Sequence, residues 1–176
     1  YYLNEDERNF GKDETSPTGN ITAANSGLSG KVVFFDAEDY DGLDSEKDYL
    51  FGGRSFTMFK VTNEGLEQVF DSGNDFEAKT AVYLPGYFNC SNDALTKDDR
   101  SGKKGPEPET VVTGEVGGRS YVFVTLERIG GVMVYDITDP SNVAYVNYIN
   151  SRDFSNDVAA DDSPEGLKFI PAEKSP

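Results

Sequence analysis

Four consecutive apolar segments between residues 109 and 150 constrain the fold more than any other feature of the sequence. They read ETVVTGE, RSYVFVTLER, GGVMVYDIT and NVAYVNYIN, and in each one apolar side chains alternate with polar or small ones. This alternation indicates β-strands with one buried face, because successive side chains of a strand point to opposite sides. Two Gly-Gly pairs and a DPSN segment separate the runs and favour tight turns. The sequence therefore predicts an antiparallel four-stranded meander.

Shorter β-type segments precede the meander. KVVFF at 31–35 predicts a strand, and a second strand is expected to begin near Tyr49, after an acidic loop. The segment FTMFKVTNEGLEQVFD alternates in polarity on both sides of residues 63–65, which predicts a β-hairpin with its turn there. Residues 1–30 are polar and show little periodicity, so we expect an exposed arm or loop.

One segment between these strands favours a helix. Asn74 or Asp75 can cap its start, and Pro85 limits its end. The apolar positions of this helix are Phe76, Ala78, Val82 and Tyr83. A polar loop from residue 89 to residue 104 is expected to follow it.

A Pro-Glu step precedes the meander and occurs again near the end of the sequence. GPEPE leads into the first strand at Glu109, and SPEG leads into a similar segment at Glu165, which is expected to begin another strand. A repeat at this spacing points to a β-propeller, in which each four-stranded meander is one blade. A closed propeller needs at least about four blades of roughly 40 residues. We therefore expect an all-β fold with one short helix, in which residues 31–176 supply about two and a half blades of a longer chain.

The balance of charges restricts the partners. The chain has 32 acidic and 16 basic residues, so its formal net charge is −16. Such a charge repels nucleic acids and anionic membrane surfaces and favours cations and basic surfaces. The absence of His removes the imidazole ligands of zinc enzymes and the usual general base. A bound metal is then expected to have oxygen ligands, which suit calcium or magnesium, and the excess of Asp and Glu favours calcium.

Further features concern the cellular setting. The lone Cys90 can form no disulfide within the chain. No segment has the roughly 18 apolar residues that a membrane span needs, and the first residues lack the regions of a signal peptide. The triplets Asn20-Ile21-Thr22 and Asn89-Cys90-Ser91 match the acceptor pattern for N-glycosylation.

Several segments together resemble the choice-of-anchor I family. They are YLFGGRSFTMF, VFDSGNDFE, DDRSGKKGPEPE, GEVGGRSYVFVTLERIGGVMVYDITDP, NYINSRDF and DDSPEGLKFIPA, in this order from about residue 31 to residue 176. The resemblance implies a secreted or cell-surface β-propeller, and some family members are labelled alkaline phosphatases. One departure is Thr110, where the family usually has Gly after GPEPE.

The first candidate site consists of Glu107, Glu109 and Glu165. The innermost strand of each propeller blade lines the central channel, so these carboxylates are expected at the channel entrance. The preceding prolines limit the backbone and favour a site for a hard cation. We expect Glu109 and Glu165 to face a common channel, with calcium or water between them. The alternative is that these side chains are solvated at the start of a strand.

The acidic segment DAEDYDGLDSEKD is the second candidate. It departs from the EF-hand pattern, because Ala37 occupies the first ligand position and no entering helix is predicted. A looser calcium loop would use Asp36, Asp39, Asp41 and Asp44. A solvated acidic turn is the alternative.

Arg54 and Arg128 are candidate phosphate or anion ligands, because a guanidinium group binds such oxygens in pairs. The alternative is that each pairs with a carboxylate, for which Glu127 and Asp153 are candidates.

These observations predict an extracellular cell-surface or matrix module, associated with calcium, that acts in binding or adhesion. Its partners would be divalent cations and cell-wall, matrix or protein surfaces, without nucleic acid and without direct insertion into a membrane. The alternative is a calcium-dependent phosphoesterase of the alkaline phosphatase or phytase type, in which calcium bridges phosphate and activates water.

Overall fold

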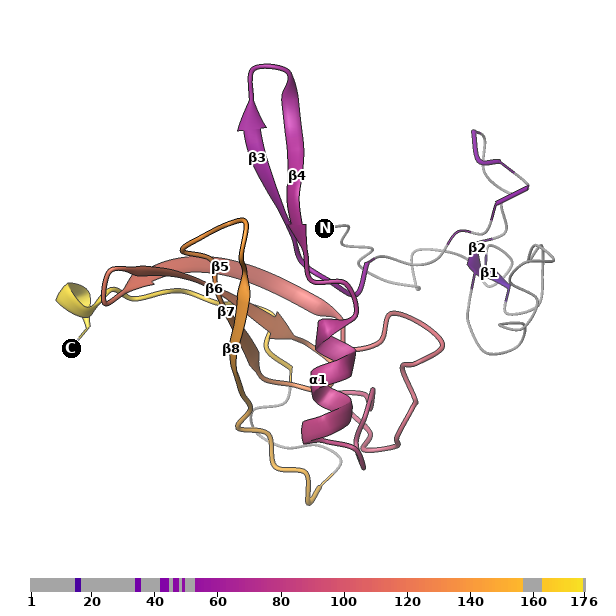
Figure 1. The fold of residues 1–176 in the computed structure, drawn as a ribbon. Helices are drawn as coiled ribbons and strands as arrows, with labels where there is room; N and C mark the ends of the chain where they lie inside the picture. The colour runs from indigo at the N-terminus through magenta and orange to yellow at the C-terminus, as the bar shows by residue number, and fades with distance from the viewer. Residues whose placement is uncertain are drawn as a thin grey trace.

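A computed structural model of the chain describes residues 15–16, 34–35, 42–44, 46–47, 49, 53–156 and 163–175. The strands β1 (Thr15–Ser16) and β2 (Phe34–Phe35) pair antiparallel. The hairpin strands are β3 (Thr57–Thr62) and β4 (Gly65–Asp71), and helix α1 (Asp75–Tyr83) follows them. The main sheet contains β5 (Pro108–Val116), β6 (Arg119–Leu126), β7 (Val132–Asp136) and β8 (Ala144–Ile149). A 3₁₀ helix, Ala172–Lys174, lies near the C-terminus (Figure 1).

The four-stranded meander is confirmed. Strands β5 to β8 form one antiparallel sheet in sequence order, as expected of short connections. Gly117 and Gly118 join β5 to β6, and both have positive φ, 59° and 77°. A two-residue hairpin turn of type I′ needs this conformation at both positions. The all-β class and the single short helix are thus confirmed, whereas closure into a propeller stays a prediction.

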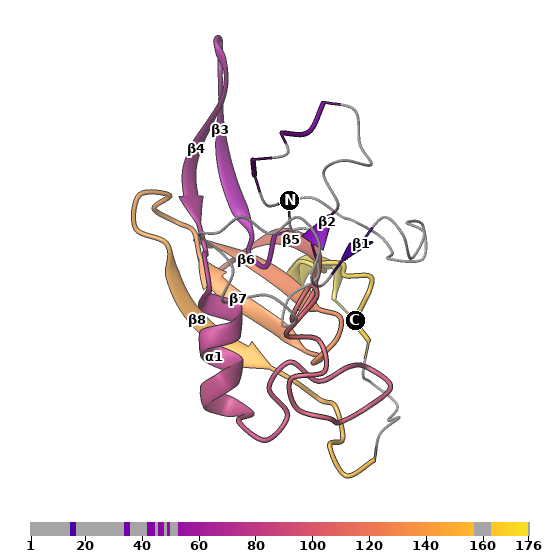
Figure 2. The ribbon, with the colours of Figure 1, turned by 90° about the vertical axis from the view of Figure 1, so that its right-hand side faces the viewer.

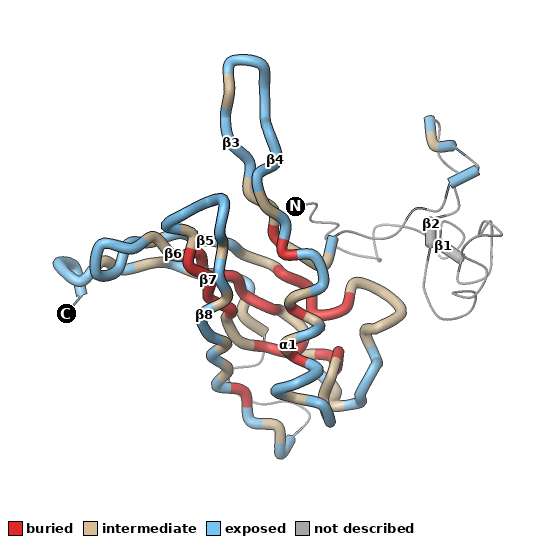
Figure 3. The backbone as a smooth tube through the Cα atoms, viewed as in Figure 1, coloured by how far each residue is buried: buried red, intermediate tan, exposed pale blue. Residues whose placement is uncertain are grey.

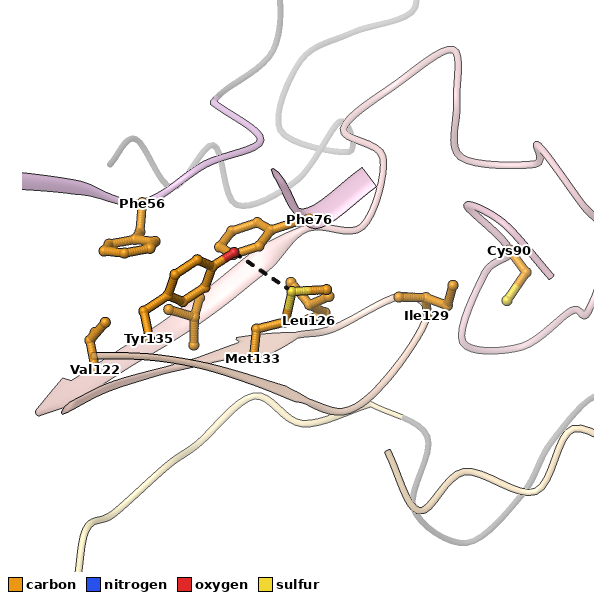
Figure 4. Packing of buried hydrophobic residues seen from close by; sticks show 9 residues of the cluster. Phe56, Phe76, Cys90, Val122, Leu126, Ile129, Met133 and Tyr135 are labelled. Atoms are coloured by element: carbon orange, nitrogen blue, oxygen red, sulfur yellow. Dashed lines mark hydrogen bonds between the residues drawn. The ribbon is translucent and has the colours of Figure 1, made fainter. Parts of the chain in front are cut away.

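One face of the sheet carries the hydrophobic core. Val122, Val124 and Leu126 of β6 alternate onto this face and are buried. Met133 and Tyr135 of β7 lie on the same face, since Met133 pairs with Val124 and Tyr135 with Val122. Figure 3 shows the buried segments of the sheet next to α1, and Figure 4 shows the side chains of this layer, with Phe56 and Phe76 beside Tyr135.

Two aromatic side chains cover this layer. Phe56 precedes β3 and lies 5.1 Å from the ring of Tyr135, measured between centroids. Phe76 of α1 lies 6.2 Å from both rings. These aromatic contacts attach the helix and the hairpin base to the sheet.

Helix α1 is confirmed in position, and one of its four apolar positions is buried. Phe76 is buried, whereas Ala78, Val82 and Tyr83 are exposed. The second buried position is Thr80, whose hydroxyl donates a hydrogen bond to the Phe76 carbonyl at 2.9 Å. A polar side chain can be buried at this position because its hydroxyl is satisfied by the backbone of its own helix.

The β3–β4 hairpin is confirmed and projects away from the sheet in both views (Figures 1 and 2). Its base is closed by the Ser72 hydroxyl, which accepts a hydrogen bond from the Phe56 amide at 2.9 Å. Towards its tip the hairpin is exposed, and this includes Val61 at 81% and Leu66 at 69%.

The segment after Pro164 was expected to begin a strand, and this expectation was wrong. Residues 163–170 are extended but pair with no strand among the described residues. They cross the sheet face opposite the core, where the Thr110 hydroxyl donates a hydrogen bond to the Glu165 carbonyl. Phe169 stacks on Phe123, with ring centroids 5.8 Å apart, and fills the space above Gly114. The segment is held by side-chain packing instead of a hydrogen-bonded ladder.

In the described part of the chain, no helix has the length and apolar character of a membrane span.

Gly131 and Gly117 offer a matched test of the sheet geometry. Both have positive φ, but a Cβ at Gly131 would lie 2.6 Å from the Ile149 carbonyl oxygen, whereas one at Gly117 would meet no atom within 4 Å. Gly117→Ala should cost about 1–2 kcal/mol through backbone strain alone. Gly131→Ala should cost about 2 kcal/mol more, because the clash adds overpacking. Urea unfolding measures both, and equal losses would contradict the packing of β7 against β8.

Candidate functional site

The backbone at the start of β5 holds Glu107 in an unusual conformation. Glu107 lies between Pro106 and Pro108 and has a φ of 50°, which costs a residue with a Cβ about 1–2 kcal/mol. Two main-chain hydrogen bonds fix the segment to the β6–β7 connection. The Glu127 amide donates to the Glu107 carbonyl at 2.9 Å, and the Arg128 amide donates to the Pro106 carbonyl at 3.2 Å. The Pro-Glu-Pro step is therefore anchored by main-chain hydrogen bonds at both Pro106 and Glu107.

Three cations surround the Glu107 carboxylate, which is 5% exposed. Arg100 donates a hydrogen bond to Oε1, the Lys104 ammonium lies 3.2 Å from Oε2, and the Arg128 Nε lies 3.1 Å from Oε1. Arg100 and Lys104 belong to the long loop before β5, whereas Arg128 belongs to the β6–β7 connection. We call these four side chains the Glu107 cluster. It joins the loop to the sheet.

Glu127 lies beside this cluster, with its Oε1 3.1 Å from the Arg128 Nη1. Burial raises the pKa of Glu127 to about 6; Arg128 opposes this shift, and the negative charges of Glu107 and Glu109 add to it. Burial also acts to raise the pKa of Glu107, but the guanidinium groups of Arg128 and Arg100 prevail and lower it to about 2. Two neighbouring carboxyl groups therefore titrate in different pH ranges.

Glu109 and Glu165 lie within electrostatic range of each other, beside the cluster. Burial raises the pKa of Glu109, and the negative charges of Glu107 and Glu165 raise it further. Within the described part of the chain, the Glu109 carboxylate accepts no hydrogen bond and forms no ion pair. Glu165 is exposed. Of the predicted glutamates, the structure thus encloses Glu107 in cations and leaves Glu109 and Glu165 at the rim.

A small hollow lies next to Glu109, and most of its lining is apolar. The lining residues are Ser55, Phe56, Thr57, Pro108, Glu109, Thr110, Val111 and Val124. The hollow combines a carboxylate with hydrocarbon walls, which suits a cationic group on an apolar stem.

The two candidate anion ligands already have protein partners. Arg54 pairs with Glu77 at 2.8 Å and donates to the carbonyls of Ser101 and Lys103 at 2.8 and 2.6 Å. For Arg128, the alternative of pairing with Glu127 is confirmed. Binding of an anion by either residue stays a prediction and would require these contacts to open.

The acidic segment lies mostly outside the described residues, which exclude Asp36, Asp39 and Asp41. Asp44 is exposed, accepts a hydrogen bond from the Glu46 amide at 3.0 Å and pairs with Lys47 at 3.1 Å. These contacts are typical of a solvated turn. Across the described ranges, no three Asp, Glu or Cys side chains are placed to hold a metal ion together. The calcium assignment stays a prediction.

Sequence reasoning missed two buried polar residues in this region. Arg152 donates to the Arg128 carbonyl at 2.8 Å and to the Asn92 carbonyl at 3.2 Å. Asn89 donates to Glu77 and Ser101. Both residues lie in polar segments without periodicity, so no pattern in the sequence distinguishes them from solvated residues.

Removal of the central anion tests the Glu107 cluster. Glu107→Gln leaves three cations without their shared charge partner and should lower the free energy of unfolding by about 3 kcal/mol or more. Glu115→Gln, on the exposed part of the same strand, should change it by less than about 0.5 kcal/mol. Urea denaturation at pH 7 distinguishes them. Similar small effects for both variants would show that the cluster contributes little to stability.

The raised pKa of Glu127 predicts a pH dependence of stability. The folded chain binds this proton more tightly than the unfolded chain, in which the pKa has its ordinary value of 4.5. The stabilisation is thus complete below pH 4.5 and is lost as the pH rises through about 6, with a total of up to about 2 kcal/mol. In Glu127→Gln this loss of stability should disappear. The free energy of unfolding of the variant should therefore rise relative to that of the wild type between pH 4.5 and 7. Urea unfolding at several pH values measures this difference, and free energies of unfolding that change equally with pH in both proteins would contradict the prediction.

Comparison with known proteins assigns the chain to a family. A family model described as the choice-of-anchor I domain matches residues 6–140. Gigasin-3a of Magallana gigas is 29% identical over 146 residues, which cover 74% of this chain and 51% of that protein. A mesenchyme-specific cell surface glycoprotein of Strongylocentrotus purpuratus is 30% identical over 105 residues, which cover 53% of this chain and 13% of that protein. The match thus spans about half of the first relative and less of the second. No solved structure matches the chain.

Proposed function

Since the chain belongs to the choice-of-anchor I domain family, we propose that it is an extracellular cell-surface or matrix module that binds cationic groups and performs no catalysis. The family and the relative named as a cell surface glycoprotein support a surface location. The net charge of −16 supports a cationic partner, because it attracts cations and basic surfaces at long range.

The rim formed by Glu109 and Glu165 is the proposed binding site. The observation that carries the proposal is the half-buried Glu109 carboxylate, which has no hydrogen bond or ion pair among the described residues. Its raised pKa reflects burial and the nearby anions Glu107 and Glu165. A cation bound beside Glu109 would reduce this repulsion and stabilise the ionised form. Bound positive charge would therefore stabilise the ionised form of the rim.

Two cationic groups fit this rim. Calcium prefers several oxygen ligands, and two carboxylates would give only a weak site, with a dissociation constant on the order of 10⁻⁴–10⁻³ M. A Lys or Arg side chain of a partner protein would place its aliphatic stem in the adjacent hollow and its charge beside Glu109. A second calcium site at Asp36, Asp39, Asp41 and Asp44 remains part of the proposal.

The alternative function, a calcium-dependent phosphoesterase, requires cationic side chains that are available to bind a phosphate group. Arg54 pairs with Glu77, whereas Arg100 and Arg128 pair with Glu107. These pairings favour the binding module over the enzyme.

Calorimetric titration with calcium, and separately with a short lysine-rich peptide, tests the proposal. We expect binding by the wild type and by Glu115→Gln, and at least fivefold weaker binding by Glu109→Gln. Glu115→Gln removes the same charge from the exposed part of β5, so it controls for general attraction to an acidic chain. Absence of binding to both ligands, or equal binding by the two variants, would contradict the site.

A p-nitrophenyl phosphate assay of the same proteins addresses the alternative. Calcium-dependent turnover that Glu109→Gln abolishes would favour the phosphoesterase.

A further inference from the structure

The triplet Asn89-Cys90-Ser91 matches the acceptor pattern for N-glycosylation, in which the sugar is joined to the side-chain amide nitrogen of Asn. We infer that folding closes this acceptor. A glycan can reach Asn89 only before the loop between α1 and β5 has folded, and a chain that carries one there cannot complete this loop.

The amide nitrogen of Asn89 is enclosed by two hydrogen bonds. Nδ2 donates to the Glu77 Oε1 at 2.7 Å and to the Ser101 Oγ at 3.1 Å. The carboxylate of Glu77 accepts hydrogen bonds, so it fixes the amide with its nitrogen towards α1. Both hydrogens of Nδ2 are thus in use, and Asn89 has no exposed surface. A sugar on Nδ2 would replace one of these hydrogens and displace Glu77 or Ser101.

The remainder of the triplet is also enclosed. Cys90 has no exposed surface, and Ser91 is 5% exposed. Asn89 has a φ of 48°, and its carbonyl accepts a hydrogen bond from the Arg100 amide at 2.9 Å. The Arg152 guanidinium lies 3.6 Å from the Cys90 Sγ. The triplet therefore offers neither a free amide nor an accessible backbone to a modifying enzyme.

The residues that enclose the Asn89-Cys90-Ser91 triplet are made at different times during synthesis. Glu77 precedes Asn89 in the chain, whereas Ser101, Arg100 and Arg152 follow it. The acceptor stays open until these later residues have left the ribosome and the loop has closed. Occupancy at Asn89 is consequently set by a competition between modification and folding, and slower folding should raise it.

An accessible acceptor in the same chain provides the matched control. Asn142 is exposed in the turn before β8, and Ala144, the first residue of β8, is exposed as well. Ala144→Thr creates an Asn-Val-Thr triplet that begins at Asn142, and Thr is well suited to a strand.

The test expresses the full chain through the secretory pathway of a eukaryotic host and measures glycan occupancy by mass spectrometry. We expect less than about a tenth of the soluble wild type to be modified at Asn89, because its amide is buried and hydrogen-bonded. In Ala144→Thr, most chains should be modified at Asn142 and few at Asn89. Glu107→Gln loosens Arg100 without touching Asn89 and should raise Asn89 occupancy severalfold. High occupancy at Asn89 in the folded wild type would overturn the inference.

A second measurement is independent of expression. A purified oligosaccharyltransferase should modify a synthetic peptide of residues 84–95 and leave the folded chain unmodified at Asn89. If the peptide is also unmodified, the local sequence rather than the fold protects Asn89, and the inference fails.

Discussion

The Glu107 carboxylate connects two parts of the molecule that lie apart in the chain. Through Arg100 and Lys104 it holds the long loop before β5, and through Arg128 it holds the β6–β7 connection. Burial of ions is costly unless the charges meet and their hydrogen bonds are satisfied. Here three cations share one carboxylate, and Glu127 supplies a second negative charge at 3.1 Å from Arg128. The left-handed backbone at Glu107 is anchored by main-chain hydrogen bonds to the β6–β7 connection, which holds the carboxylate beside Arg128.

The same loop is attached at two further points. Arg54, at the hairpin base, binds the Ser101 and Lys103 carbonyls, and Glu77 of α1 binds both Arg54 and Asn89. The loop has no helix or strand of its own, so these polar contacts replace the backbone ladder that orders regular elements. The apolar core attaches the helix and the hairpin base to the sheet, while the polar network attaches the loop. The proposed rim at Glu109 lies where the two systems meet.

The sheet and hairpins could be predicted because period-two alternation and Gly-Gly turns are local signals. The buried side of α1 could not be predicted, because the burial of Thr80 instead of Val82 depends on how the helix packs in the folded chain. The segment at Glu165 resembles a strand, but a strand needs a pairing partner, and pairing is not a property of one segment. In the candidate site, Glu107 was identified from its two prolines, but its cationic surroundings were not. Arg100 and Lys104 occupy a polar loop without periodicity, so only the folded chain shows that they converge on Glu107.

The projecting β3–β4 hairpin bears on how the purified chain behaves in solution. Two strands alone are marginally stable in water, and both edges of this pair lack a partner strand among the described residues. Val61 and Leu66 add exposed apolar surface near the tip. Such an edge favours contact between molecules, whereas the net charge of −16 keeps them apart. Because salt shortens the range of that repulsion, the colloidal stability of the chain depends on ionic strength more than its folding does.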